Sequence, residues 1–139
     1  MPTITTVYTG QMSFAAEAGG APAGLIDVPA SMGGQGRGAT PPELFVVSLG
    51  SCVAGYVATY CEQHGLDTTG LAVDVGYAKV DDPTRLVDLT VTVRLPHADC
   101  GARAAAIRRV AQHCPVHETI ATLSGIRIDV LDRAALTPA

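Results

Sequence analysis

The chain has 139 residues, a formal net charge of −4 and only 4% aromatic residues. This length predicts one domain, 1–139, with a moderate core. The mild negative charge, without a basic patch, argues against nucleic-acid binding. The start, MPTITTVYTG, has neither the positive charge nor the apolar segment of a signal peptide. We therefore expect a cytoplasmic protein whose four cysteines are reactive, metal-binding or buried, and do not form a disulfide framework.

Three short strands are expected first, because β-branched, aromatic and apolar residues gather in short segments there. They are placed at 3–9, 11–16 and 24–28, with a turn at 19–22 between the last two. Together they would form an antiparallel meander. The glycine-rich stretch SMGGQGRGA that follows, 31–39, matches neither the P-loop nor the dinucleotide-binding pattern. We interpret it as a flexible lead-in to the next element. It contains Arg37, the first lysine or arginine of the chain.

The stretch TPPELFVVSLGSCVAGYVATYCEQHG predicts a long helix over 41–64. Thr40 is the expected N-cap, Pro41 the first helical residue, and Glu43 the acidic partner in a capping box. Gly65 stands where a residue in the left-handed conformation commonly ends a helix. The helix is therefore delimited at both ends by local sequence.

No charged residue lies between Leu44 and Cys61. A helix that is apolar on all sides must be covered on all sides, and a run of this length raises the question of a membrane span. We reject a membrane span because the run contains serine, threonine and glycine, begins with a soluble-type cap and lacks flanking positive charge. One sheet of a small chain covers about one face of a helix. We therefore expect a second copy of the chain to cover the rest.

The remaining elements follow from alternation of apolar and polar residues for strands and from helical spacing for helices. They are a hairpin of two strands at 70–80 and 87–95, two helices at 101–113 and 115–122, a last strand at 126–130 and a frayed tail at 133–139. Pro115 separates the two helices. Helices combined with antiparallel strands in this order indicate an α+β fold.

Cys52 and Cys114 are the candidate reactive thiols. Cys52 lies in the middle of the long helix, where a free cysteine is often only a small buried apolar side chain. Cys114 precedes Pro115 at the start of a helix, where backbone N–H groups and the helix dipole stabilise a thiolate. A cap position that any small polar residue can fill is the alternative. Cys61 and Cys100 are interpreted as incidental.

Two further candidates carry weaker signals. Cys114 and His117 suggest zinc, but the chain has no C-x-x-C pair and the spacing fits no standard zinc finger, so we expect no metal. Glu43 has the chemistry to orient an arginine beside a thiolate, yet the capping box alone explains a glutamate at this position.

The segment TPPELFVVSLGSC, followed 62 residues after its cysteine by the cysteine of HCPV, resembles the OsmC/Ohr family of thiol-dependent peroxidases. The order of the expected elements extends the resemblance over nearly the whole chain. It implies an intertwined homodimer in which antiparallel sheets wrap around two long central helices, with active sites at the interface. It also implies that Cys52 attacks the peroxide and Cys114 resolves the product.

The function implied by this resemblance is reduction of organic hydroperoxides in an oxidative stress response. An external dithiol or lipoyl-type reductant would restore the thiols, and no cofactor is needed. Organic hydroperoxide resistance members activate the thiolate with an arginine paired with a glutamate, for which Arg37 and Glu43 are the candidates here. The first 36 residues contain no arginine, so the sequence resembles the broader OsmC-like group more than the Ohr subgroup. The alternative is a non-catalytic or small-ligand-binding member.

Overall fold

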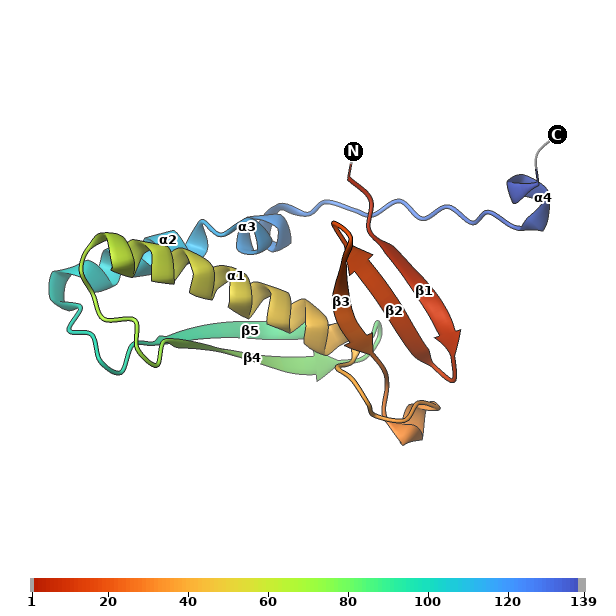
Figure 1. Ribbon diagram of the computed structural model, residues 1–139, viewed down its shortest axis with the longest axis horizontal. Helices are drawn as coiled ribbons and strands as arrows, with labels where there is room; N and C mark the ends of the chain where they lie inside the picture. Colours follow the sequence, from red (N-terminus) through yellow and green to blue (C-terminus); the bar gives the residue numbers. More distant parts are fainter. Residues whose placement is uncertain (1, 138–139) are drawn as a thin grey trace.

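The computed structural model describes residues 2–137, and its helices and antiparallel strands confirm the α+β class. The elements, labelled in Figure 1, are β1 (Thr5–Gly10), β2 (Ser13–Ala18), β3 (Ala21–Ile26), η1 (Ala30–Met32), α1 (Pro41–Gln63), β4 (Ala72–Val80), β5 (Arg85–Arg94), η2 (Gly101–Arg103), α2 (Ala104–Gln112), α3 (Pro115–Thr122) and α4 (Arg133–Leu136). The strands β1, β2 and β3 form a sheet that stands apart from a body built of α1, α2, α3 and the β4–β5 hairpin (Figure 1).

The N-terminal sheet is the expected antiparallel meander, in the order β1-β2-β3. Two of its strands begin at other residues than predicted. β2 begins at Ser13 and not at 11, and β3 begins at Ala21 and not at 24. The second strand is displaced because Gln11 and Met12 both have positive φ and form the first turn. The second turn needs only Gly19 and Gly20, also at positive φ, so Ala21 already belongs to β3.

Both ends of α1 agree with the prediction. The Glu43 amide donates to Thr40 Oγ1 at 3.3 Å, and the Thr40 amide donates to Glu43 Oε2 at 3.0 Å, which is a complete capping box. Gly65 has φ +69°, the left-handed conformation expected just after the helix. The cap satisfies backbone N–H groups that have no partner inside the helix.

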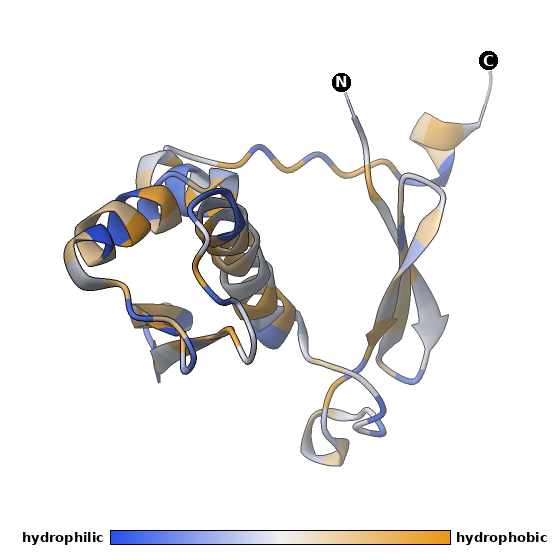
Figure 2. Cartoon of the chain, turned by 60° about the vertical axis from the view of Figure 1, so that its left-hand side comes forward, coloured by the Kyte–Doolittle hydropathy of each residue, from blue (hydrophilic) through white to orange (hydrophobic). Residues whose placement is uncertain are grey.

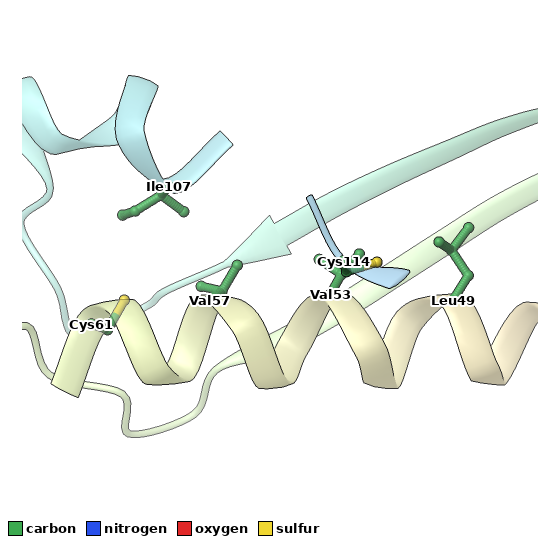
Figure 3. Close-up of a cluster of buried hydrophobic side chains, with 6 residues drawn as sticks. All are labelled: Leu49, Val53, Val57, Cys61, Ile107 and Cys114. Carbon is green, nitrogen blue, oxygen red and sulfur yellow. The ribbon is translucent and has the colours of Figure 1, made fainter. Parts of the chain in front are cut away.

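The core is a stripe of side chains on α1. Its residues recur every four positions and therefore lie on one side of the helix, as Figure 3 shows. They are joined by one residue from α2 and one from the start of α3, so the buried cluster consists of Leu49, Val53, Val57, Cys61, Ile107 and Cys114. The β4–β5 hairpin packs partly buried apolar side chains against the same cluster. The core thus joins three helices and the hairpin.

Shortening Leu49, whose side chain is only 3% exposed, is expected to destabilise the fold. Leu49→Ala removes buried methyl groups and leaves a cavity, a combination that costs about 2–5 kcal/mol. The free energy of unfolding in urea, measured at fixed protein concentration, checks this. Glu62→Ala, an exposed change on the same helix, is the control and should lie within about 0.5 kcal/mol of wild type. Equal effects from the two variants would contradict the core assignment.

Part of the apolar surface of α1 is not covered within one protomer. Phe45, Val47 and Tyr56 are exposed there, Val47 to 58%. The expectation that the helix is buried on all sides is therefore not met by a single chain. By length and composition alone α1 passes the test for a membrane-crossing helix. An apolar core helix passes the same test when its outer face is covered by protein.

The predicted last strand at 126–130 is wrong for the protomer. The segment is extended and unpaired, and it runs from α3 away from the body (Figure 1) with apolar and polar residues alternating along it (Figure 2). Ile126, Ile128 and Val130 are all strongly exposed, Val130 to 88%. A strand needs a neighbour to pair with, and the segment has none among residues 2–137. Part of the expected frayed tail forms α4, capped by Asp132, while 138–139 lie outside the described residues.

Candidate functional site

Cys52 lies half-buried on α1, one position before Val53 of the core stripe. It forms part of the wall of an open hollow of about 600 Å³ on the flank of the helix. The other residues of this hollow, which we name the thiol hollow, are Ser51, Gly55, Tyr56, Thr59, Tyr60, Gln63 and Val110. The Cys52 thiol can therefore be reached by a small molecule while it also packs against the core.

Cys114 is fully buried and is the N-cap of α3, as the sequence predicted. Its Sγ accepts a hydrogen bond from the His117 amide at 3.3 Å. Burial raises the pKa of the Cys114 thiol, the amides of His117 and Val116 counteract this, and the neighbouring Cys52 thiol raises the pKa further. The balance is a raised pKa, so Cys114 is a protonated thiol near neutral pH.

The fold brings Cys52 and Cys114 together although 62 residues separate them in the sequence. Cys52 packs against the buried cluster that contains Cys114, and its proximity raises the pKa of the Cys114 thiol. Both are free cysteines. An accessible thiol therefore lies next to a buried one, which is the arrangement that a two-cysteine redox reaction requires.

Arg37 is bound to Asp27, a residue that the sequence analysis did not select. The carboxylate of Asp27 is fully buried and accepts from Arg37 Nε at 3.2 Å, from the Arg37 amide at 3.2 Å and from the Val28 amide at 2.7 Å. Gly34 and Gly38 pack so closely on the 25–28 segment that no side chain fits at either position. The glycine-rich loop is thus ordered around Asp27, and the prediction of a flexible lead-in is wrong.

Stability is expected to fall at acid pH because of Asp27. Burial alone raises the pKa of its carboxyl, but the hydrogen bonds from Val28, Arg37 and Gln35 outweigh this and hold the pKa below its ordinary value. A carboxyl with a lower pKa in the folded state stabilises the fold above the unfolded-state pKa of about 3.9, and this stabilisation disappears as the pH falls through the folded-state value.

We therefore expect Asp27→Asn to lower the midpoint of thermal unfolding at neutral pH and to flatten its fall below about pH 5. Thermal scans at a series of pH values measure both effects. Asp88→Asn, which changes an exposed carboxyl on β5, is the matched control and should keep the wild-type pH dependence. If the unfolding midpoint of Asp27→Asn falls with pH as steeply as that of wild type, Asp27 does not cause the loss of stability at acid pH.

Neither Arg37 nor Glu43 contacts Cys52 within one protomer. Arg37 is hydrogen-bonded to Asp27, before α1 begins, and Glu43 is hydrogen-bonded to Thr40 at the first turn of the helix. Cys52 lies nine residues after Glu43, which is roughly 13 Å further along a helix that rises 1.5 Å per residue. The helix therefore keeps the predicted activating pair away from the thiol of its own chain.

A larger hollow of about 850 Å³ lies between α1, β5, α2 and α3, and we name it the inter-helix hollow. Its walls are mostly apolar and include Cys100 and His117, but neither Cys52 nor Cys114. The thiol hollow is the candidate active site in spite of its smaller size, because it contains the accessible thiol of the pair.

His117 Nδ1 is buried and has no hydrogen-bond partner in the described part of the chain. Within 2–137, no three His, Cys, Asp or Glu side chains are grouped to hold a metal ion.

A long apolar helix with an accessible thiol, packed against a buried thiol at a second helix, defines an α+β protein with a paired-thiol site. The sequence model of the OsmC-like protein family matches residues 34–130, most of the chain. The protein therefore belongs to the OsmC-like family, which confirms the resemblance found in the sequence. Among curated proteins, none matches the sequence.

Solved structures show the same fold at low identity. An osmotic stress induced and detoxification response protein from Psychrobacter arcticus is 21% identical with a TM-score of 0.76, over 86% of this chain and 88% of that one. An OsmC-like protein from Mycoplasma pneumoniae is 18% identical with a TM-score of 0.70, over 88% of each chain. The organic hydroperoxide resistance protein OhrB of Bacillus subtilis is 17% identical with a TM-score of 0.60, over 87% and 90%.

Proposed function

We propose that the protein reduces organic hydroperoxides, with Cys52 as the attacking thiol and Cys114 as the resolving thiol. The observation that carries the proposal is the pairing of an accessible thiol on α1 with a buried thiol at the N-cap of α3. Membership of the OsmC-like family supports it, because relatives of the same fold include organic hydroperoxide resistance proteins.

The reaction has two steps at the protein. The Cys52 thiolate attacks one oxygen of the hydroperoxide, the O–O bond breaks, and the other oxygen leaves with a proton as the alcohol, so that Cys52 becomes a sulfenic acid. The Cys114 thiol then attacks the Cys52 sulfur, an S–S bond forms, and water leaves. An external dithiol or lipoyl-type reductant restores both thiols by exchange, and no cofactor takes part.

The two environments support this division of roles. Cys52 lines a hollow that is open to a substrate, whereas Cys114 is fully buried and can react only with a neighbouring group. The raised pKa of Cys114 keeps it a thiol until Cys52 is oxidised. Tyr56, Tyr60 and Val110 give the hollow apolar walls, which favour the organic part of an alkyl hydroperoxide over hydrogen peroxide.

We further propose that two copies form the intertwined homodimer that the sequence resemblance implied. The uncovered part of α1, the detached N-terminal sheet and the unpaired 126–130 segment all expose apolar side chains that a second copy would cover. Arg37 and Glu43 keep their predicted role at Cys52 only as contributions from the partner chain. Light scattering should give twice the chain mass of 14.2 kDa. A monomer would exclude both the homodimer and a contribution of Arg37 and Glu43 from a partner chain.

The direct test is turnover by the wild-type protein. Cumene or tert-butyl hydroperoxide should be consumed when dihydrolipoamide or dithiothreitol is supplied, with one alcohol formed for each dithiol oxidised. Absence of consumption with both reductants would overturn the enzyme proposal.

A second function is favoured by one observation, the apolar inter-helix hollow of about 850 Å³, which contains neither thiol of the pair. A non-catalytic member would use it to hold a small apolar molecule. Saturable binding of an apolar fluorescent probe, together with no hydroperoxide consumption, would identify this alternative.

A further inference from the structure

A second pair of cysteines lies at the C-terminal end of α1, where Cys61 belongs to the buried cluster and Cys100 packs against that cluster. Cys61 lies in the last turn of the helix, fully buried, and its sulfur points to the side on which α2 packs (Figure 3). Cys100 lies just before η2, is half-buried, and lines the inter-helix hollow. One thiol of this pair is therefore inside the core and the other is open to a small molecule.

Contacts around the two residues hold the end of α1 against the start of η2. Arg103 Nη1 donates to the Tyr60 hydroxyl at 3.3 Å, next to Cys61 in the chain. The Arg103 amide donates to the Cys100 carbonyl at 2.9 Å, which closes the turn that begins at Cys100. The Cys100 side chain packs against the buried cluster that contains Cys61. The fold thus places the second pair together although 39 residues separate the two in the sequence.

The electrostatics agree with this proximity. Burial raises the pKa of the Cys61 thiol, and the nearby Cys100 raises it further. Cys61 is therefore a protonated thiol shielded from solvent, and Cys100 is the member that an oxidant meets first.

We propose that Cys61 and Cys100 are a second redox pair, which closes a disulfide when the protein meets an organic hydroperoxide. The Cys100 thiol, as thiolate, attacks the O–O bond, the alcohol leaves, and Cys100 becomes a sulfenic acid. The Cys61 thiol attacks the Cys100 sulfur, the S–S bond forms, and water leaves. Two electrons pass from the two thiols to the hydroperoxide. Cys61 lies nine residues after Cys52, roughly 13 Å along α1, so the second pair acts without exchange with the first.

The proposed disulfide would tie the end of α1 to the turn that leads into α2. A cross-link of this kind restricts the unfolded chain and so stabilises the fold. It would also fix one wall of the inter-helix hollow, to which Cys100 belongs. The oxidised protein is therefore expected to unfold at a higher temperature than the reduced one.

The test uses the full chain with both residues of the first pair replaced, Cys52→Ser/Cys114→Ser, which leaves Cys61 and Cys100 as its cysteines. Treatment with cumene hydroperoxide should lower the thiols that can be alkylated after denaturation from two to none, and dithiothreitol should restore both. Trypsin should then yield the peptide containing Cys61 linked to the one containing Cys100. Since this variant lacks the first pair, the outcome is independent of the proposed peroxidase function.

Adding Cys100→Ser is the control, and Cys61 should then stay reduced because it is shielded. The inference is overturned if Cys61 remains reduced while Cys100 is over-oxidised, or if Cys100 links two chains to each other. The wild-type protein provides a second measurement should the double variant fail to fold. Combined chymotryptic and tryptic cleavage separates Cys52 from Cys61 after Tyr56 and Tyr60, and Cys100 from Cys114 after Arg103, so the Cys61–Cys100 link is identified there as well. Its absence from oxidised wild type also overturns the inference.

Discussion

Replacing Cys52 by serine, in a chain that also carries Cys100→Ser so that the second pair cannot react, is expected to abolish dithiol-driven consumption of cumene hydroperoxide, with a loss of roughly a thousandfold or more in rate. The serine hydroxyl is similar in size to the thiol, but near neutral pH it provides no nucleophile able to break the O–O bond, and no sulfenic acid can form. Because Cys52 is only half-buried, the substitution should leave the fold intact. A coupled assay of reductant oxidation measures the rate, and circular dichroism checks the fold.

Cys100→Ser is the matched control, since it also removes a half-buried thiol but lies outside the thiol hollow. This variant should keep the turnover that depends on Cys52, and lose only the reaction of the second pair. A Cys52→Ser protein that still consumes hydroperoxide at the wild-type rate would remove Cys52 from the mechanism, and a similar loss in both variants would point to a general effect of thiol removal.

Replacing Cys114 by serine is expected to separate the first reaction step from the second. Serine is a good N-cap residue and can accept the His117 amide as the thiol does, so α3 should remain in place. Cys52 should still react once with hydroperoxide, but without a resolving thiol the sulfenic acid accumulates and steady-state turnover is lost.

Two measurements distinguish this outcome. Rapid mixing without reductant, with Cys100→Ser added to both proteins to silence the second pair, should show one equivalent of hydroperoxide consumed per Cys52 in the Cys114 variant, as in the parent with Cys114. Dimedone should label Cys52 strongly in the variant and weakly in wild type, where the disulfide forms instead. Equal labelling of the two proteins, or full turnover without Cys114, would show that another group resolves the sulfenic acid.

The features that could be predicted from the sequence are those that depend on neighbours a few residues away. The capping box of Thr40 and Glu43 spans a single helical turn, so the start of α1 follows from local chemistry. The β4–β5 hairpin follows from alternation within each strand. The N-cap position of Cys114 follows from the proline after it.

The features that were missed depend on contacts between distant parts of the chain. Asp27 gave no local signal, because its burial results from the return of the glycine-rich loop and from the pairing with Arg37. The 126–130 segment has the alternation of a strand, but alternation alone provides no neighbour to pair with. Sequence spacing alone left Cys61 and Cys100 as incidental residues.

Propensity, capping and periodicity act over short distances, and they sufficed to predict α1, α2 and α3, most of the strands and the candidates Cys52 and Cys114. Only the tertiary structure decided which thiols are neighbours, which of them is open to a substrate, and what binds Arg37. The physical reason is that burial and side-chain contacts are set by how α1, α2 and α3 pack on one another. Arg37 lies outside this packing, because the return of the glycine-rich loop holds it against Asp27 before the start of α1.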